Sequence, residues 1–247
     1  MNTTASVEAS AITAPESERV ALRQAILLAA IFALLKFLIH LGANLWEAHI
    51  GWGYFRDEMY YILCGQHLDW GYVDHGPIVA LQARIGVALF GKSLAGIRVL
   101  SAMAGAIAVF FTGIIAWALG GRRVAQALAM LGLLLAPEYL GLDSFLSMNS
   151  FEPVFWMAAV VAVLMLLRGA PPTRWWILFG VAGGLGIENK PSMVVFLVAL
   201  LIGLLMTPQR RMVFTRGAAL GVALVVLLAL PNLLWQIHNH FPTFLAG

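Results

Sequence analysis

The sequence of 247 residues is 61% hydrophobic and 11% charged, with a mean hydropathy of +0.88, whereas soluble domains carry about 25% charged residues. These values exclude a soluble globular protein, and apolar runs of helical length favour membrane helices over a β-barrel. The net charge of +3 comes from basic residues dispersed among short loops, so it does not indicate a nucleic-acid partner. The single cysteine, Cys64, excludes a disulfide or a cysteine-based metal cluster within this sequence.

The first segment, residues 1–23, is rich in Ala, Ser, Thr and Glu, and we predict a disordered cytoplasmic tail. Two arginines then precede the apolar run 25–41, which is the pattern of a signal peptide. The run is long for a signal peptide and contains Lys36, so a retained signal-anchor helix is favoured over cleavage. We therefore expect one transmembrane domain over residues 24–247.

The apolar runs that follow predict a polytopic bundle of about seven transmembrane helices, and hence an all-α membrane protein. The fifth and sixth spans are short and are separated by Glu188-Asn189-Lys190-Pro191. Residues 174–207 therefore form either two spans or one re-entrant hairpin. The predicted spans are 24–42, 94–119, 124–140, 151–168, 174–188, 191–207 and 216–235.

Charge placement predicts which ends of these helices lie together. With the N-terminus inside, nine basic residues fall in cytoplasmic connections and five on the other side, as the positive-inside rule requires. Outside the N-terminal tail every acidic residue falls on the outer side, and acids do not set topology. We therefore expect one outward-facing acidic site that several loops build. The acids are Glu47, Asp57, Glu58, Asp69, Asp74, Glu138, Asp143, Glu152 and Glu188.

The long outer segment 43–93 is dense in acids, aromatic residues and histidine, although apolar sequence surrounds it. Residues 57–67 are compatible with a short helix, and 77–89 form a second apolar stretch, so two helices are predicted along the membrane interface. Most of the aromatic residues here are typical of an interfacial belt. The packing of an apolar bundle does not need the carboxylates, which favours chemistry or ligand binding.

Three sequence motifs carry a resemblance to a known family. They are Asp57-Glu58 followed by Tyr60-Tyr61 and the stretch Gly71 to Pro77; the stretch Asp143 to Ser150 leading into Phe151-Glu152-Pro153; and the stretch Gly184 to Pro191. Together they resemble the dolichyl-phosphate-mannose protein mannosyltransferases, C-type membrane glycosyltransferases of the glycosyltransferase 39 type. Bacterial polyprenyl-phosphate-sugar transferases share that fold. Members of the family are longer, so we expect this chain to be a truncated, N-terminal half that is slow or inactive alone.

The resemblance implies that a sugar moves from a polyprenyl-phosphate carrier to a hydroxyl acceptor, which is a lipid, a glycan or a protein, on the outer membrane face. Asp57 is the expected base that takes the acceptor proton; the alternative is a cap on a helix that begins at Glu58. Glu58 is expected to orient the acceptor or bind a cation, or else to serve only as a helix N-terminal charge. We expect a bacterial inner-membrane protein with a cytoplasmic N-terminus and a periplasmic site.

The remaining site predictions concern phosphate, acceptor and metal. Lys190, with Arg98 as a lesser candidate, is expected to bind the donor phosphate; a lysine that snorkels to the interface is the alternative. Asp143 and Glu152 are expected to form a second acidic wall or an acceptor-binding surface, with Tyr60 and Tyr61.

A divalent cation (Mg, Mn or Zn) is a further prediction, with Asp74 and His75 as ligands beside Asp143 or Glu152. The alternative is a structural hydrogen bond of His75. Two other function classes remain open: a non-catalytic membrane subunit or truncated paralogue, and a transporter. Lys36 alone lies deep within a predicted span, which argues against a transport pathway.

Overall fold

The computed structural model describes residues 16–245, and these form helices joined by turns, with no strand among them. In chain order the helices are α2 (Glu16–His49), α3 (Arg56–Gln66), α4 (Pro77–Phe90), α5 (Leu94–Ala118), α6 (Arg123–Leu135), α7 (Pro137–Leu142), α8 (Met148–Leu167), α9 (Pro172–Asn189), α10 (Ser192–Leu205), the 3₁₀ helix η2 (Pro208–Phe214), α11 (Arg216–His238) and α12 (Pro242–Leu245).

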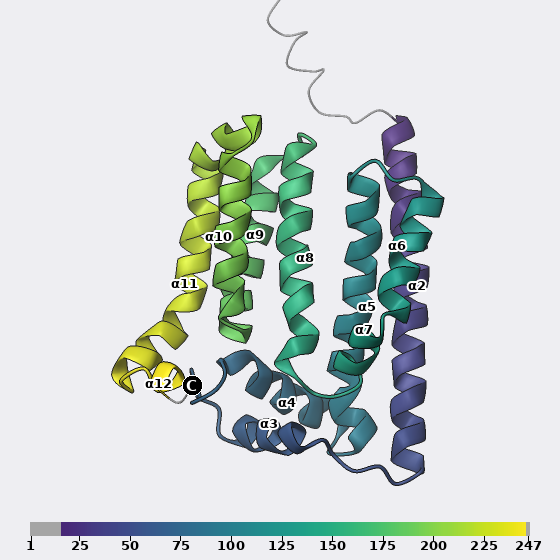
Figure 1. Cartoon of the computed structure of the whole chain (residues 1–247), viewed down its shortest axis with the longest axis vertical. Coiled ribbons are helices and arrows are strands. Elements are labelled where there is room, and N and C mark those ends of the chain that lie inside the picture. The colour runs from purple at the N-terminus through teal and green to yellow at the C-terminus, as the bar shows by residue number, and fades with distance from the viewer. Residues whose placement is uncertain (1–15, 246–247) are drawn as a thin grey trace, which may run out of the picture.

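Four of these helices, α2, α5, α8 and α11, are long and apolar enough to cross a membrane. A helix also occupies each of the other predicted spans: α6 and α10 are apolar but shorter, and α9 has 18 residues. The all-helical membrane class is therefore confirmed, and the count of seven spans stays a prediction. α9 and α10 run beside α8 and α11 (Figure 1), and whether they are two spans or a hairpin stays open.

Two element boundaries differ from those predicted. α2 begins at Glu16 rather than at residue 24, so part of the expected tail is helical; residues 1–15 lie outside the described residues. The span expected over 124–140 ends at Leu135, and α7 then starts at Pro137. The cause is local, because proline disfavours helical geometry in the residue before it and has no N–H to donate.

Small residues let the long helices of the bundle approach closely. A Cβ added at Gly113 in α5 would lie 2.7 Å from the sulfur of Met130 and 2.9 Å from the Cβ of Ala29. The buried core between α2, α5, α6 and α8 is built around these positions. Close packing of this kind is what holds helices together in lipid, where burial alone supplies little drive.

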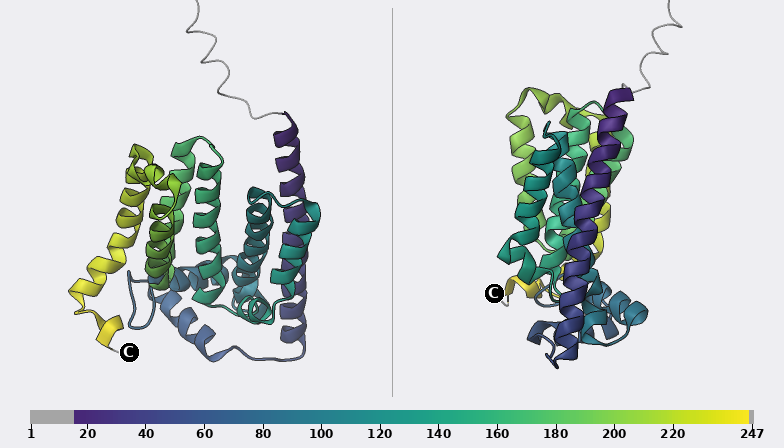
Figure 2. Two further views of the ribbon diagram at one scale, coloured as in Figure 1. Left: turned by 45° about the horizontal axis from the view of Figure 1, so that its top comes forward. Right: turned by 90° about the vertical axis from the view of Figure 1, so that its right-hand side faces the viewer.

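α3 and α4 lie across one end of the bundle instead of running along it (Figures 1 and 2). Helices therefore occur at both places predicted in segment 43–93. α4 packs against α3, α5 and α9. Tyr61 of α3 and Val79 and Ala83 of α4 form a small core with Leu146, which precedes α8. We call α3, α4 and the segment between them the end layer. Its position at a membrane interface stays a prediction.

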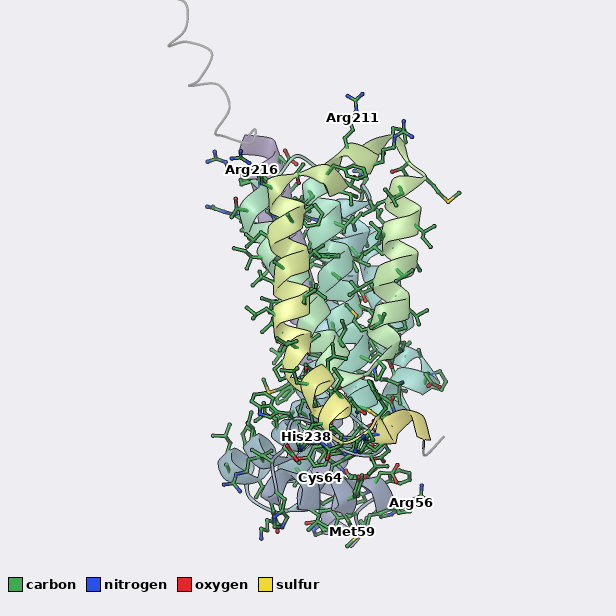
Figure 3. All side chains as sticks on the ribbon, turned by 90° about the vertical axis from the view of Figure 1, so that its left-hand side faces the viewer. Arg56, Met59, Cys64, Arg211, Arg216 and His238 are labelled. Atoms are coloured by element: carbon green, nitrogen blue, oxygen red, sulfur yellow. The ribbon has the colours of Figure 1, made fainter. Side chains whose placement is uncertain are left out.

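Basic residues of several turns gather at one end of the bundle. Arg211 and Arg216 lie at the end where α2 begins, and Arg56 lies at the opposite end with the end layer (Figure 3). Arg168 and Arg123 contact Glu18 and Gln24 near the start of α2, which places two more basic turns at that same end. The grouping of loops by side thus agrees with the predicted topology, although which side is cytoplasmic stays a prediction.

Candidate functional site

Glu58 is the anchor of the end layer. It is fully buried in α3, and Arg98 of α5 donates to both of its oxygens, from Nε and Nη2, at 2.8 Å each. The backbone N–H groups of Phe55 and Leu146 also donate to it, at 2.8 and 2.9 Å. Arg98 in turn donates from Nη1 to Glu47 of α2 at 2.6 Å. One carboxylate therefore ties together α3, α5 and the segment before α8, and reaches α2 through the guanidinium.

These contacts affect the roles predicted for Glu58 and Arg98. Glu58 already accepts four hydrogen bonds, so it has little capacity left for an acceptor or a cation. Arg98 is 5% exposed and lies between two carboxylates, so a phosphate would have to compete with both of them. The geometry shows structural contacts for both residues; their ligand contacts stay predictions. The sequence positions of Glu47, Glu58 and Arg98 do not indicate that the three side chains are in contact.

Asp57 precedes this anchor and has different surroundings. Its side chain is 40% exposed and pairs with the Nε of Arg56 at 3.0 Å. The helix begins at Arg56, with Phe55 as the N-cap. The alternative in which Asp57 caps a helix beginning at Glu58 is therefore wrong: it is the Glu58 carboxylate that accepts the N–H of the capping residue. Asp57 is an accessible carboxylate next to a rigidly held one.

Three tyrosines surround the ring of His75 in the end layer. The ring centroids of Tyr60, Tyr61 and Tyr72 lie 5.4, 5.2 and 4.6 Å from that of the imidazole. The His75 Nδ1 lies 2.7 Å from the carbonyl oxygen of Gly76, and we assign it the proton that donates to this oxygen. Burial lowers the pKa of His75, so the neutral ring is favoured.

Asp74 connects this aromatic cluster to solvent. Its Oδ1 accepts a hydrogen bond from the Tyr60 hydroxyl at 2.8 Å and lies 4.0 Å from the buried Nε2 of His75. Burial, followed by the charges of Asp57 and Asp74, raises the pKa of Tyr61 to about 12. The hydrogen bond between Tyr60 and Asp74 joins the two halves of the predicted first-loop motif.

Lys190 follows the last residue of α9 and is held by α8. Its Nζ donates to Asn149 at 2.9 Å and to Glu152 at 2.8 Å, and a third of its side chain is exposed. Ser192 donates to the other oxygen of Glu152. The ammonium has three donors, so one remains for a ligand. The motif that contains Asn149 was identified from the sequence, but the partnership of Asn149 with Lys190 was not.

Asp143 does not join Glu152 in an acidic wall. It forms an ion pair of 3.0 Å with Lys36 inside the bundle, and the two side chains are 2% and 0% exposed. Lys36 also donates a hydrogen bond to the carbonyl oxygen of Tyr139, at 3.1 Å. Burial raises the pKa of Asp143 to about 6, and the charge of Lys36 opposes that shift. In the sequence, the position of Lys36 within an apolar run is the feature that could have indicated a buried partner of opposite charge.

The predicted metal ligands do not gather into one set. Within residues 16–245 there is no group of three or more His, Cys, Asp or Glu side chains that could hold a metal ion. Asp143 pairs with Lys36 and Glu152 with Lys190, so neither completes a site with Asp74 and His75. The described residues do not fit a divalent cation at this place, and the need for a metal stays a prediction.

Comparisons with known proteins give a consistent family. Residues 74–235 match the family described as dolichyl-phosphate-mannose-protein mannosyltransferase. The chain is 29% identical over 160 residues to undecaprenyl phosphate-alpha-4-amino-4-deoxy-L-arabinose arabinosyl transferase 1 of Pseudomonas fluorescens, an alignment that covers 64% of this chain and 28% of that protein.

A second relative is the lipid A galacturonosyltransferase RgtD of Rhizobium johnstonii, which is 26% identical over 212 residues, or 82% of this chain and 43% of RgtD. The chain thus spans less than half the length of either relative. No solved structure matches it.

Proposed function

Because this chain belongs to the dolichyl-phosphate-mannose-protein mannosyltransferase family, we propose that it transfers a sugar from a polyprenyl-phosphate carrier to a hydroxyl acceptor on the outer face of the membrane. Both relatives are named as sugar transferases, and one name includes an undecaprenyl phosphate sugar. The end layer contains Asp57, Glu58, Asp69 and Asp74, and basic turns lie at the other end of the bundle; both support a site on the outer side.

The observation that carries the mechanism is the accessible carboxylate of Asp57 beside the immobilised Glu58. The acceptor oxygen attacks the anomeric carbon, and its proton passes to Asp57. The bond between that carbon and the phosphate oxygen breaks, and its electrons leave with the polyprenyl phosphate. Glu58 and Arg98 hold the first turn of α3, so that the base is already in place before substrates bind.

Lys190 is the group that we assign to the leaving phosphate. Its ammonium keeps one free donor and an exposed face, and the contacts with Asn149 and Glu152 fix its position. A fixed cation favours the charge that develops on the phosphate as the sugar leaves. The Glu152 carboxylate partly neutralises this ammonium, and the phosphate would then share it with Glu152. No step is assigned to a metal ion.

The structural contacts that occupy Glu58 and Arg98 favour a second reading, in which the chain is a non-catalytic membrane subunit or paralogue. An assay of sugar transfer by the purified, reconstituted chain distinguishes the transferase from the subunit. The assay follows release of radiolabelled sugar from a polyprenyl-phosphate donor to a lipid or glycan acceptor. Transfer that Asp57→Asn abolishes and Glu138→Gln leaves intact supports the transferase, because Glu138 is an exposed acid on α7. Folded wild type that neither binds the polyprenyl-phosphate donor nor transfers its sugar supports the subunit.

A further inference from the structure

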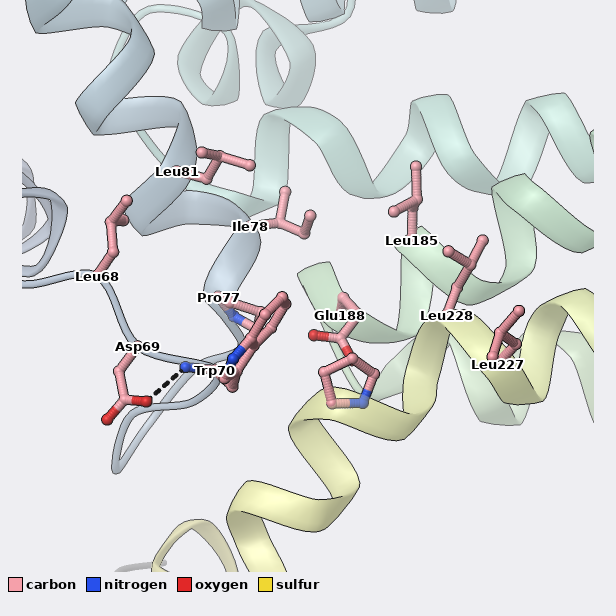
Figure 4. Close-up of a pocket in the computed structure, with 11 residues that line it drawn as sticks. Leu68, Asp69, Trp70, Pro77, Ile78, Leu81, Leu185, Glu188, Leu227 and Leu228 are labelled. Carbon is pink, nitrogen blue, oxygen red and sulfur yellow. Dashed lines mark hydrogen bonds between the residues drawn. The ribbon is translucent and has the colours of Figure 1, made fainter.

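A cavity of about 580 Å³ lies beside the end layer, between α4, α9 and α11 (Figure 4). Its walls are largely aliphatic. Among the described residues that line the cavity, the charged ones are Asp69 and Glu188, and no lining residue is Lys, Arg or His. A volume of this size suits one small ligand or one segment of a lipid chain. The wall residues are Leu68, Trp70, Pro77, Ile78, Leu81, Leu185, Leu227, Leu228 and Pro231.

Glu188 supplies the polar point of this cavity. It is 4% exposed, and its Oε1 accepts the backbone N–H of Asn232 at 3.1 Å. Its Oε2 is buried and has no hydrogen-bond partner among the described residues. Figure 4 shows the carboxyl between Pro77 and Leu228, directed into the cavity. An unmatched buried carboxyl oxygen is costly, and a ligand that donates a hydrogen bond would remove the cost.

The position of the cavity points to a ligand from the membrane. Leu227 and Leu228 belong to α11, which is a candidate span with most of its surface unburied. The cavity lies where this helix meets the end layer, and α11 carries Pro231 at that level. A lipid chain can therefore enter from the bilayer while its headgroup stays near Glu188 and Asp69.

The charges argue against a phosphate in the same place. Neither Asp69 nor Glu188 offers a positive charge, and no described lining residue would neutralise a phosphate. Lys190 lies two residues after Glu188, but its ammonium contacts Asn149 and Glu152 of α8. Near the end of α9, Lys190 therefore offers a positive charge on one side and Glu188 a buried hydrogen-bond acceptor on the other. The first suits a phosphate and the second suits a ligand that donates a hydrogen bond.

We propose that this cavity binds the sugar acceptor, and that the acceptor is a membrane lipid whose uncharged headgroup donates a hydroxyl hydrogen bond to Glu188. The assignment as acceptor rests on the proposed transferase function, whereas lipid binding in the cavity does not. The aliphatic walls hold one chain of the lipid, and Glu188 selects a hydroxyl over a phosphate headgroup.

The test uses the purified chain in lipid nanodiscs with a diacylglycerol that carries a photoreactive group in one acyl chain. Crosslinks should map to α4 and α11. Phosphatidic acid with the same chains should compete roughly threefold to tenfold less well than unlabelled diacylglycerol, which is the range of one hydrogen bond. Leu228→Trp fills the cavity and should abolish the crosslink. Leu233→Trp, at an exposed position of the same helix, should leave it unchanged.

Two variants test the headgroup contact. Glu188→Gln keeps an oxygen acceptor and should retain the preference for diacylglycerol, whereas Glu188→Leu should bind both lipids alike. An undiminished crosslink in Leu228→Trp would overturn the proposal. A preference of the wild type for phosphatidic acid would also overturn it. Displacement of diacylglycerol by polyprenyl phosphate at equal concentration would overturn it too, because the cavity would then be the binding site of the sugar donor. If the crosslink behaves as expected and sugar transfer is absent, the proposed function fails and the lipid site stands.

Discussion

Arg98 of α5 and Glu58 of α3 form a buried, two-point ion pair, with both N–O distances at 2.8 Å. Side-by-side hydrogen bonds of this kind fix orientation as well as distance. The pair joins the end layer to the bundle at Glu58, the residue that follows the exposed Asp57. A catalytic carboxylate in a loop would otherwise move with that loop, so the pair explains how the first turn of α3 can be rigid.

Glu58→Gln should destabilise the protein strongly. The amide removes the negative charge from a fully buried position and leaves Arg98 with Glu47 as its remaining carboxylate partner. Loss of one partner of a buried pair costs about 3–5 kcal/mol. Thermal unfolding in detergent should show a clear drop in the midpoint relative to the wild type. Glu138→Gln is the matched control at an exposed site, and equal midpoints for the two variants would contradict the role of Glu58 as an anchor.

Asp57→Asn should leave folding nearly unchanged and remove sugar transfer. The side chain keeps its size, and its one described partner is the exposed Arg56. Without a base, the rate should fall by roughly a hundredfold to ten-thousandfold. The measurement is single-turnover transfer together with the unfolding midpoint, so that catalysis and stability are read separately. Near-normal transfer by this variant would show that the base is misassigned.

Lys190→Ala should weaken donor use by roughly tenfold to a hundredfold, the range for loss of a hydrogen bond to a charged group. Lys190→Arg should recover part of the loss, because a planar fork replaces a compact ammonium. Donor titrations of the transfer rate give the comparison. Lys92→Ala is a control at an exposed lysine at the same end of the bundle. Equal donor use by the Lys190 and Lys92 variants would leave Lys190 as an interfacial lysine.

His75 should make the protein less stable in mild acid. Burial lowers its pKa in the folded state below the ordinary value of 6.5. The unfolded chain therefore binds the proton more readily, and stability falls as pH drops below about 6.5 and through the folded pKa. As pH drops from 8 to 5, the unfolding midpoint of the wild type should decrease relative to that of His75→Gln. Asp143, whose pKa is raised, acts in the opposite direction in both proteins, so the difference between them isolates His75.

The orientation in the membrane can be tested with thiols. Cys64 is buried and its pKa is raised by burial, so it should react slowly with maleimides. In a Cys64→Ser background, Met59→Cys places an exposed thiol on the end layer and Met206→Cys places one at the opposite end. An impermeant maleimide should label the first in intact spheroplasts and the second only after permeabilisation. The reverse pattern would invert the topology.

The sequence alone determined the class of this protein and the order of its elements. Apolar runs specify membrane helices because lipid leaves every backbone group to be satisfied within the helix. Proline and charge mark where those helices end. Two bounds differ from the expected ones: α2 begins earlier, at Glu16, and α6 ends earlier, before Pro137. The motifs around Asp57, Asp143 and Lys190 pointed to the family that the comparisons then confirmed.

The tertiary structure alone decided which polar groups meet. Glu58 pairs with Arg98, Asp143 with Lys36, and Lys190 with Glu152. In each pair the two residues come from different elements. Sequence periodicity reports which face of a helix is buried, but a buried charge takes whichever partner the packing of neighbouring helices brings within reach. For that reason the acids that the sequence placed on one side have four different settings in the structure. Asp57 is an exposed candidate base, Glu58 is a buried anchor and Asp143 forms an ion pair inside the bundle. Glu188 lines a cavity, and one of its buried oxygens has no hydrogen-bond partner among the described residues.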